Sequence, residues 1–509
     1  MESGLIKSLY KLKTLDSEIQ KLLHIKALLE WDQETYLPRR AVSERAEQIA
    51  LMEGIIHDKI VSPEFGELLD AMGASAENPC GTLTISDENK GLVRAVYRRY
   101  MRYNAVPNDL NMELARQTSL AQARWFNARK ISDYSIFQPN LKTLINLFQQ
   151  KTKCIGYREH PYDALLDEYE PWMTTKQLDI LCSSMAEQLK LLAGKIMEKG
   201  NSVGIDLFDK HFDIEKQKKF ALFILGKMGF DFQRGRVDIS VHPFTTTLGK
   251  SDVRITTRYI TGLFNSGLFG LMHEGGHGLY ELGFSKDILN TILANGTSLG
   301  IHESQARFWE NFIGKSHSFW KAFFPELQKL FPEELTGVDT LTFYKAVNTV
   351  KPSLIRVEAD EVTYNLHIIL RYRLEKALIT GDLSTDDLPE AWRSESQSLL
   401  GVKPATDEEG VLQDIHWASG AFGYFPTYCL GNMYSAQFYH TLTTHKPQIL
   451  DEMAGGNLFP VFNWLRENIH YYGSIYSAEE LCRKITGESL NDGYFITYLE
   501  EKFNNIYEL

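Results

Sequence analysis

The stretch TGLFNSGLFGLMHEGGH, residues 261–277, has the largest influence on the predicted fold. Its first part is almost wholly apolar, which indicates the start of a buried helix. Positions four apart share one helix face, so His273 and His277 can bind one metal ion from the same side. Glu274 is turned by about 100° from His273, near enough to contact a water on such an ion without being a ligand itself.

Two imidazoles, one further protein ligand and one exchangeable water form the usual pattern of a catalytic zinc site. A water on zinc can have a pKa of about 7, and a nearby carboxylate such as Glu274 then takes its proton as the water attacks a carbonyl. The alternative is an ordinary buried helix whose histidines have structural partners. Gly275 and Gly276 argue against that alternative, because each costs about 1 kcal/mol in a helix interior relative to Ala. They indicate that a substrate or a neighbouring helix approaches the backbone closely.

The third ligand is expected elsewhere in the chain, because the metzincin pattern HExxHxxGxxH is not complete. Residues 295–298 supply capping residues for a second predicted helix over residues 299–312. This helix carries His302 and Glu303 side by side, and only one of them can face the ion. We favour Glu303, which completes a set of two histidines and one carboxylate. His302 is then an outer or packing residue, and a histidine ligand at this position is the alternative.

Composition limits the classes of function. The chain has 509 residues and a formal net charge of −12, which argues against nucleic acid as the main partner, since such binding needs clustered positive charge. Five scattered cysteines without a CxxC pair favour a reducing compartment. Residues 5–31 show helical spacing with interspersed charges and no secretory segment, and no apolar run approaches the ~20 residues of a membrane span. We therefore expect a cytoplasmic protein that does not associate with membranes.

Most of the chain is predicted to be helical. The length allows about two to four domains or one large helical body, and the sequence shows no repeats and no linker that would divide it. Residues 73–87 and 199–205 are expected to form surface loops. Long stretches with helical periodicity cover residues 5–31, 88–103, 108–129, 175–199 and 355–379.

One region shows strand periodicity instead. Apolar and polar residues alternate over 237–242 and again over 253–258, with a predicted turn at 248–252. This pattern predicts a two-stranded hairpin just before the metal helix. An exposed strand edge beside a hydrolytic metal can bind an extended peptide through main-chain hydrogen bonds. A small structural hairpin with one wetted face is the alternative.

Several separate stretches together resemble one family, the carboxypeptidase Taq family of zinc metallocarboxypeptidases. WDQETYLP (31–38) is similar to the family's N-terminal signature, with Leu37 where Met is usual, and GYFPTY (423–428) is similar to another family segment. The resemblance spans nearly the whole chain in the family's order, which makes it far more specific than HExxH alone. The other matching motifs are HPF (242–244), DVRIT (252–256), HEGGH (273–277), HESQ (302–305), IRVEAD (355–360) and GVLQDIHW (410–417).

The resemblance implies a mainly α, single-domain metallopeptidase over residues 1–509, with a deep groove and a small β-hairpin or sheet beside the metal helix. An N-terminal helical part over about 1–200 would cover the groove, the metal-site core would span about 205–435, and C-terminal helices would cover 436–509. It also implies a cytosolic homodimer that removes amino acids singly from peptide C-termini with broad side-chain tolerance.

The family's site residues have counterparts in this sequence. His273, His277 and Glu303 match its metal ligands, and Glu274 matches its general base. The implied cofactor is one Zn²⁺ per chain, and Co²⁺ is the alternative ion because similar sites accept both.

A carboxypeptidase must also recognise a free α-carboxylate, which a guanidinium binds in a forked, two-bond geometry. Arg356 is the first candidate, because IRVEAD resembles the family's substrate-facing helix. Arg254, on the polar face of the predicted hairpin, is the second candidate. A structural ion pair, with Asp360 or Asp252 respectively, is the alternative for each.

Three further side chains are candidates for substrate binding. His416 is predicted to donate a hydrogen bond to the substrate or the oxyanion, with Asp414 orienting a histidine. His242 is held extended by the following proline, which would fix its ring toward the site. Tyr424, or else Tyr428, would supply a phenolic donor, and a core position is the alternative for both.

The predicted reaction is metal-assisted hydrolysis, in which Glu274 accepts the water proton and passes it to the leaving amine. Two other functions remain open at this point. One is a helical zinc oligopeptidase or dipeptidyl carboxypeptidase, which would not predict IRVEAD and QDIHW together. The other is a non-catalytic scaffold with structural zinc, against which the intact general base and the absence of a fourth protein ligand argue.

Overall fold

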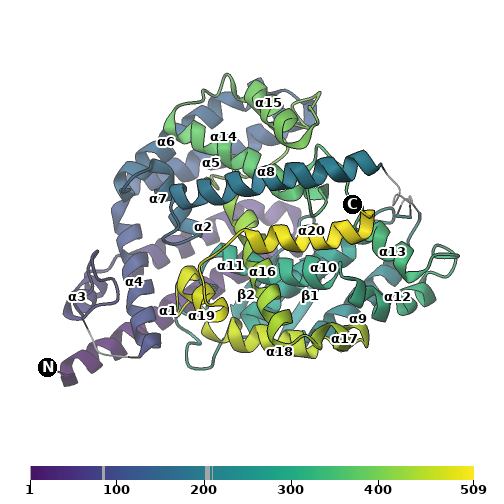
Figure 1. The fold of residues 1–509 in the computed structure, drawn as a ribbon. Helices are drawn as coiled ribbons and strands as arrows, with labels where there is room; N and C mark the ends of the chain where they lie inside the picture. The colour runs from purple at the N-terminus through teal and green to yellow at the C-terminus, as the bar shows by residue number, and fades with distance from the viewer. Residues whose placement is uncertain (1, 83–85, 201–206, 209) are drawn as a thin grey trace. The chain divides into compact units, whose positions relative to one another are not determined.

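The computed structural model describes residues 2–82, 86–200, 207, 208 and 210–509. Within these residues the chain forms α-helices α1 to α20 and one three-stranded sheet (Figure 1). This confirms the mainly α fold class. Residues 83–85 and 201–205, which belong to the two predicted surface loops, lie outside the described residues.

The contacts between residues divide the chain into two compact units, each assembled from three stretches of sequence. The first unit comprises residues 1–104, 205–347 and 438–489, and the second comprises 105–204, 348–437 and 490–509. The expected single domain with three consecutive parts remains a prediction.

The first unit holds the sheet and the HEGGH helix. Its elements are α1 (Glu2–Thr35), α2 (Val42–Ile60), α3 (Pro63–Ala71), α4 (Asp87–Ala105), α9 (Ile214–Met228), β1 (Gly235–Ile239), β2 (Thr245–Gly249), β3 (Asp252–Thr257), α10 (Phe264–Leu282), α11 (Leu299–Arg307), α12 (His317–Leu330), α13 (Thr340–Val347), α17 (Ile449–Ala454), α18 (Phe459–Asn468) and α19 (Ala478–Thr486).

The second unit is helical throughout its described regular elements. The helix α16 (Pro426–His445) begins in this unit and ends in the first. The remaining elements are α5 (Asn108–Ile131), α6 (Gln138–Ile155), α7 (Pro161–Tyr169), α8 (Thr175–Lys199), α14 (Tyr364–Thr380), α15 (Leu388–Leu400) and α20 (Gly493–Tyr507).

Four of the five long predicted helices are confirmed as α1, α4, α5 and α8. The bounds of α8 agree with the prediction because its start is encoded locally. The Thr174 hydroxyl accepts a hydrogen bond from the backbone of Gln177, and the Gln177 side chain accepts one from the backbone of Thr174. This capping box satisfies two of the backbone N–H groups that a helix start leaves without partners.

The fifth predicted helix, over residues 355–379, is wrong in its first part. Only a 3₁₀ turn (Arg356–Glu358) forms there, and α14 begins at Tyr364. The carboxylate of Asp360 accepts hydrogen bonds from the backbone N–H groups of Val362 and Thr363 at 2.9 Å each. A short acidic side chain that bonds its own following backbone competes with the helical pattern, so the helix starts after it.

The predicted two-stranded hairpin is also wrong in its pairing. The two segments with alternating residues are strands β1 and β3, but they pair in parallel, and β3 lies at the centre of the order β1-β3-β2. The unexpected strand β2 pairs antiparallel with β3, so the true hairpin is β2–β3. The strand β2 has the sequence TTTLG, and its three consecutive threonines show no alternation of apolar and polar residues, although threonine favours strands. About a dozen residues separate β1 from β3, enough for a parallel crossover.

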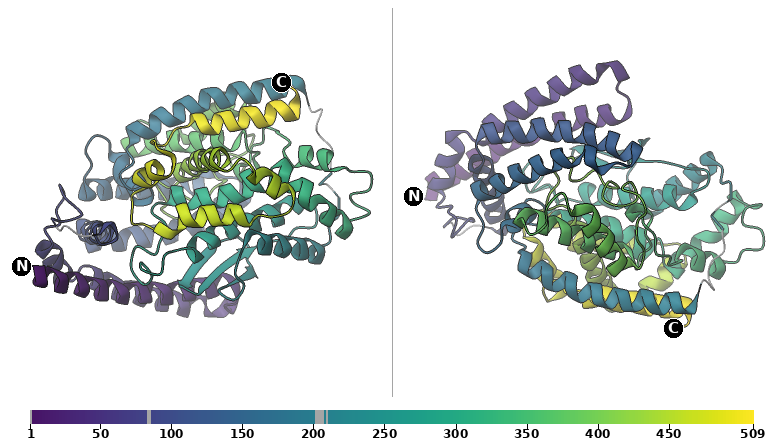
Figure 2. Two further views of the ribbon diagram at one scale, coloured as in Figure 1. Left: turned by 60° about the horizontal axis from the view of Figure 1, so that its bottom comes forward. Right: turned by 90° about the horizontal axis from the view of Figure 1, so that it is seen from above.

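The end of α1 packs on this sheet. Figure 2 shows α1 beside α2, and α1 also contacts β2. The guanidinium of Arg254 lies 4.1 Å from the centre of the Trp31 ring, and the Tyr36 hydroxyl donates a 2.6 Å hydrogen bond to Asp238. The segment WDQETYLP therefore joins the N-terminal helix to the sheet beside α10.

The glycines of HEGGH let neighbouring elements approach α10 closely. A Cβ at Gly276 would lie 2.5 Å from the carbonyl oxygen of Gln305 on α11. A Cβ at Gly275 would instead meet the side chain of Leu225 on α9 at 2.6 Å. The sequence predicted that either a substrate or a neighbouring helix approaches these glycines. The structure shows the close approach of the neighbouring helices α9 and α11. None of the described helices combines the length and the hydropathy that crossing a bilayer requires.

Candidate metal centre

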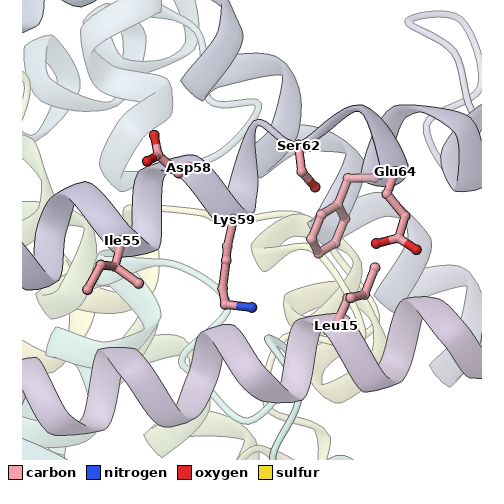
Figure 3. A pocket seen from close by; sticks show the side chains of 7 residues that line it. Leu15, Ile55, Asp58, Lys59, Ser62 and Glu64 are labelled. Atoms are coloured by element: carbon pink, nitrogen blue, oxygen red, sulfur yellow. The ribbon is translucent and has the colours of Figure 1, made fainter.

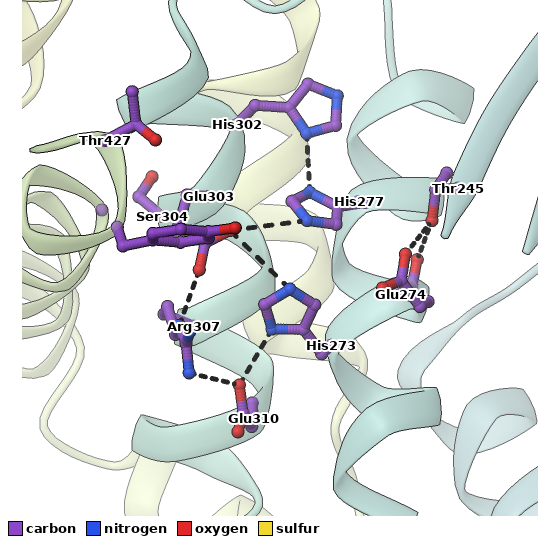
Figure 4. A network of polar contacts seen from close by, with 12 residues as sticks. Thr245, His273, Glu274, His277, His302, Glu303, Ser304, Arg307, Glu310 and Thr427 are labelled. Atoms are coloured by element: carbon purple, nitrogen blue, oxygen red, sulfur yellow. Dashed lines mark hydrogen bonds and ion pairs between the residues drawn. The ribbon is translucent and has the colours of Figure 1, made fainter. Parts of the chain in front are cut away.

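His273 and His277 of α10 face Glu303 of α11 (Figure 4). The Oε2 atom of Glu303 lies 3.7 Å from the Nε2 atom of each histidine. One donor atom from each of the three residues lies within 4.8 Å of the other two. Glu303 is 6% exposed, so this carboxylate converges with two imidazoles in a largely buried setting.

The start of α11 explains how Glu303 reaches this position. The Ser298 hydroxyl accepts a hydrogen bond from the backbone of Ile301 and caps the helix, as the capping residues at 295–298 predict. The helix then crosses α10 at Gly276, where the absence of a side chain lets the two backbones come close. The predicted helix over residues 299–312 is confirmed, except that Phe308–Ile313 continues as a π-helical segment.

The three residues fit a divalent ion. A distance of 3.7 Å is too long for a hydrogen bond, but donors that share one tetrahedral zinc are separated by about 3.4 Å. The other ring nitrogen of each histidine already has a partner, which leaves Nε2 for an ion. His273 Nδ1 lies 2.9 Å from Glu310, and His277 Nδ1 lies 2.6 Å from His302. Arg307 binds the second oxygen of Glu303 at 2.7 Å.

The two candidates for the third ligand, Glu303 and His302, lie at different positions relative to the HEGGH histidines. The His302 ring lies behind His277 and also contacts Glu281 through its Nε2 atom at 2.8 Å. It is Glu303, and not His302, that groups with the two HEGGH histidines. This is the arrangement that the sequence favoured.

Glu274 lies on the same helix but outside the group of three. The Thr245 hydroxyl of β2 donates a 2.6 Å hydrogen bond to its Oε2 atom and fixes the carboxylate. Glu274 is 6% exposed, and burial raises its pKa above the ordinary value because the charged form loses hydration. A carboxylate with a raised pKa holds a proton more readily, as a general base must.

The pKa values of His273 and His277 shift in opposite directions because their neighbours differ. Burial acts to lower the pKa of His273, but the carboxylates of Glu303 and Glu310 outweigh it and raise that pKa. Burial and the adjacent His302 hold the pKa of His277 well below its usual range. Burial also acts to raise the pKa of Glu310, yet Arg307 and His273 lower it overall. The Nδ1 atom of His273 therefore contacts a buried ion pair between Glu310 and Arg307, whereas the Nδ1 atom of His277 contacts a second histidine, His302.

Comparison with known proteins identifies the family. The model of the carboxypeptidase Taq (M32) metallopeptidases matches residues 11–503. The chain belongs to this family. It is 40% identical over 502 residues to thermostable carboxypeptidase 1 of Thermus thermophilus, which covers 96% of this chain and 97% of that protein. It is 39% identical over 483 residues to carboxypeptidase 1 of Bacillus subtilis, covering 95% of each.

Solved structures agree with this assignment. The M32 carboxypeptidase from Deinococcus radiodurans superposes with a TM-score of 0.94 at 34% identity, over 99% of this chain and 100% of that one. The Pyrococcus furiosus carboxypeptidase, in a structure described as Apo-Mg, gives a TM-score of 0.94 at 37% identity, over 97% and 99%. This M32 protein is therefore a metal-dependent carboxypeptidase that hydrolyses peptides and needs a divalent ion.

Three of the five predicted substrate-binding residues of this M32 carboxypeptidase lie together in the second unit. Arg356 is 7% exposed and donates through Nε and Nη2 to one oxygen of Asp414, at 3.0 and 2.7 Å. His416 Nε2 lies 3.2 Å from the hydroxyl of Tyr428, and the Tyr424 ring lies 5.5 Å from the His416 ring. The sequence analysis gave Asp360 as the alternative ion-pair partner of Arg356, but the structure pairs Arg356 with Asp414.

The other two predicted residues lie in the first unit and are less suited to substrate binding. Arg254 forms a two-bond ion pair with Asp252 at 2.9 Å for both bonds, which is the structural alternative foreseen for it. His242 is exposed, and its carbonyl accepts a hydrogen bond from the Ser240 hydroxyl.

Sequence reasoning missed a second arginine at Asp414. Arg371 of α14 is fully buried and donates to the other carboxylate oxygen at 2.6 Å. Two guanidinium groups thus share one carboxylate, which leaves a net positive charge. Two buried atoms of this cluster, Arg371 Nη2 and His416 Nδ1, have no hydrogen-bond partner among the described residues. No motif includes Arg371. The one signal for it was a charged residue among the apolar residues of the helix predicted over 355–379.

Glu375, also on α14, was likewise missed. It is fully buried and accepts hydrogen bonds from the Tyr162 hydroxyl, the Trp417 indole N–H and the Gly423 backbone N–H, at 2.7, 2.7 and 2.6 Å. Burial raises its pKa to about 7. Trp417 belongs to the motif GVLQDIHW and Gly423 to the motif GYFPTY, so the Glu375 carboxylate links these two motifs.

A surface pocket between α1, α2 and α3 has a different character (Figure 3). It is lined by side chains that include Leu15, Ile55 and Phe65, with Asp58, Lys59 and Glu64 at its polar part. Lys59 is already paired with Glu18 at 2.8 Å. The lining contains none of the metal-centre residues.

Proposed function

We propose that this M32 carboxypeptidase releases single amino acids one after another from peptide C-termini, with broad side-chain tolerance. Its cofactor is one Zn²⁺ per chain, held by His273, His277 and Glu303, with Co²⁺ as the alternative ion. The observation that carries this proposal is the position of the Glu303 carboxylate, 3.7 Å from both histidine Nε2 atoms. As the family resemblance implies, we further propose that the enzyme is a cytoplasmic homodimer.

Glu274 acts as the general base. When bound at this site, a divalent ion supplies Lewis-acid polarisation of the scissile carbonyl and lowers the pKa of an attacking water. Glu274 accepts the water proton and then delivers it to the amine that leaves. The Thr245 hydroxyl holds one carboxylate oxygen at 2.6 Å and keeps the side chain in one orientation. Burial, which raises the pKa of Glu274, lets the carboxyl keep the proton until the amine departs.

The cluster around Asp414 is our choice for recognising the substrate α-carboxylate. Arg356 and Arg371 together carry two positive charges against the single negative charge of Asp414. A carboxylate would neutralise the remaining charge and satisfy buried donors, and burial strengthens such a bond. Arg254 is the weaker candidate, because Asp252 already accepts hydrogen bonds from its Nε and Nη2 atoms.

Three further side chains are candidates for contacting the substrate. His416 would donate through Nδ1, which is buried, has no hydrogen-bond partner among the described residues and lies 3.9 Å from the Asp414 carboxylate. Tyr424 would add a phenolic hydrogen bond, and His242 remains a weaker candidate because it is exposed. The strand edge that would bind an extended peptide is that of β2, whose Thr245 contacts Glu274.

The product pattern tests the activity directly. A decapeptide digested with the wild-type enzyme should give a ladder of products shortened by one residue at a time, and a chelator should abolish it. Internal fragments would indicate an oligopeptidase, and two-residue steps would indicate a dipeptidyl carboxypeptidase. Stoichiometric zinc without hydrolysis of any peptide would indicate a structural scaffold. Each of these three results would overturn the proposed activity.

Two pairs of variants test the roles. Glu274→Gln should keep stoichiometric zinc and lose nearly all turnover, whereas Glu326→Gln, at an exposed glutamate of α12, should leave turnover unchanged. Arg356→Lys should mainly raise KM, because it removes the forked contact to the substrate. Arg254→Lys is its matched control. A KM that rises in the Arg254 variant and not in the Arg356 variant would reverse the assignment of the carboxylate contact.

A further inference from the structure

The metal helix carries a third polar residue in line with its two histidines. His273, His277 and Glu281 are spaced four apart on α10, so they lie along one face of the helix. His302 of α11 lies between His277 and Glu281. Its Nδ1 atom is 2.6 Å from His277 Nδ1, and its Nε2 atom is 2.8 Å from Glu281 Oε1. The Thr247 hydroxyl of β2 donates to the other oxygen of Glu281 at 2.8 Å.

The direction of these hydrogen bonds follows from the chemistry of the groups. An ionised carboxylate only accepts hydrogen bonds, so Nε2 of His302 donates to Glu281. A neutral imidazole has one donor and one acceptor nitrogen, so the Nδ1 atom of His302 must accept. The hydrogen in the bond between the two histidines therefore belongs to Nδ1 of His277. This leaves the lone pair of His277 on Nε2, the atom that faces Glu303 at 3.7 Å.

We propose that Glu281 is a positioning residue which, through His302, fixes the tautomer of His277 that can bind the ion. The inference rests on the proposed metal site and adds to it a residue that touches neither ion nor substrate. The tautomer of His273 is fixed directly by a carboxylate, because its Nδ1 atom lies 2.9 Å from Glu310. The two ligands are thus oriented by two carboxylates, one in direct contact and one through an intervening histidine.

Packing around His302 holds the ring where this relay requires it. A Cβ at Gly296 would lie 2.8 Å from Cδ2 of His302, so a side chain at this position would collide with the ring. The Tyr280 ring lies 5.2 Å from the His302 ring. The side chains of Glu281 and His302 are only 9% and 17% exposed. A ring fixed in this way keeps both of its nitrogens in hydrogen-bond contact.

Replacement by an isosteric amide tests the relay. In Glu281→Gln the side-chain amide can donate to His302 as well as accept from it, so the relay loses its fixed direction. We expect the Zn²⁺ affinity, measured by competition with a chromophoric chelator, to fall by about tenfold or more, as for other residues that orient metal ligands. The visible spectrum of the Co²⁺ protein should change as well. The thermal midpoint of the metal-free protein should stay within a degree or two of the wild type, because no charge is left unpaired.

Matched variants separate this role from a merely structural one. Thr247→Val removes a hydrogen bond to Glu281 but leaves the bond to His302, so its Zn²⁺ affinity should fall by less than about threefold. If Glu281 acts only through His302, then Glu281→Gln should cause no further loss in a His302→Leu background. Unchanged affinity in Glu281→Gln, or an equal loss in both backgrounds, would overturn the proposal. A wild-type protein without stoichiometric zinc would instead overturn the proposed metal site itself.

Discussion

The substitution Gly276→Ala places one methyl group at the crossing of α10 and α11, the two helices that carry the proposed metal ligands. The new Cβ would lie 2.5 Å from the carbonyl oxygen of Gln305 and 2.7 Å from Cα of Ala306. Ordinary contacts at such a Cβ begin at 3.4 Å. Both neighbouring atoms belong to the backbone of α11, so no side-chain rotation can relieve the contact. The helix α11 must move away by about 1 Å.

This movement has two energetic consequences. Overpacking costs about 1–3 kcal/mol, while replacing glycine in a helix interior returns about 1 kcal/mol, so the net loss of stability should be about 1 kcal/mol. Glu303 lies two residues before Gln305 and moves with α11. Its separation of 3.7 Å from the histidine Nε2 atoms would grow to about 4.5 Å, too long for donors that share one zinc ion. We expect Zn²⁺ affinity to fall at least about tenfold and kcat/KM about a hundredfold.

Gly275→Ala is the matched control. Its Cβ would meet Cδ1 of Leu225 at 2.6 Å and Cε of Met228 at 3.2 Å, which are the mobile ends of two side chains on α9. Zinc affinity should therefore stay within about threefold of the wild type. The assays are zinc competition with a chelator, release of the C-terminal residue, and thermal unfolding of the metal-free protein. A folded Gly276→Ala protein with wild-type zinc affinity, or an equal loss of affinity in both variants, would refute the reasoning.

Three further predictions follow from the buried charges. Asp414→Asn leaves two buried guanidinium groups without their carboxylate, so it should destabilise the protein by about 3–5 kcal/mol; a shift of the denaturant midpoint worth less than about 1 kcal/mol would contradict the shared ion pair. Burial raises the pKa of Glu375 from 4.5 to about 7, so the folded state favours its protonated form. Wild-type stability relative to Glu375→Gln should therefore be greatest below pH 4.5 and fall by up to about 3 kcal/mol as the pH rises past 7; midpoints that differ by the same amount at every pH would contradict this. Glu303→Ala should abolish stoichiometric zinc binding, whereas His302→Ala should only weaken it, by about ten- to a hundredfold; metal analysis after dialysis distinguishes them, and the reverse order would make His302 the ligand.

Local signals predicted the helices well. The bounds of α8 agree with the sequence because a capping box and an amphipathic stripe lie within the segment itself. Where a local hydrogen bond competes with the pattern, the prediction was wrong, as at Asp360, whose side chain bonds the backbone of Val362 and Thr363. The sheet was predicted in part, since the two alternating segments are strands. Their parallel pairing and the threonine-rich strand β2 were not predicted, because pairing depends on distant partners.

The candidate metal site also rests partly on local and partly on distant contacts. The sequence predicted His273, Glu274 and His277 from their spacing on one helix, and favoured Glu303 because carboxylate is a suitable third donor. Glu281 was within reach of the same argument, because it continues the spacing of four along α10. The partner of Arg356 was not, since Asp414 is separated from it by more than fifty residues and two arginines share it.

The amino-acid sequence by itself determined which donor atoms the chain offers, where its long helices run, and that two imidazoles share one helix face. These properties depend on hydrogen bonds and side-chain spacing within a few turns of backbone. Only the tertiary structure decided that α11 crosses α10 at a bare glycine, that His302 turns away toward Glu281, and that Asp414 lies between two buried arginines. Such contacts depend on how distant apolar faces pack together and on which buried charges must then find partners, and no local pattern contains that information.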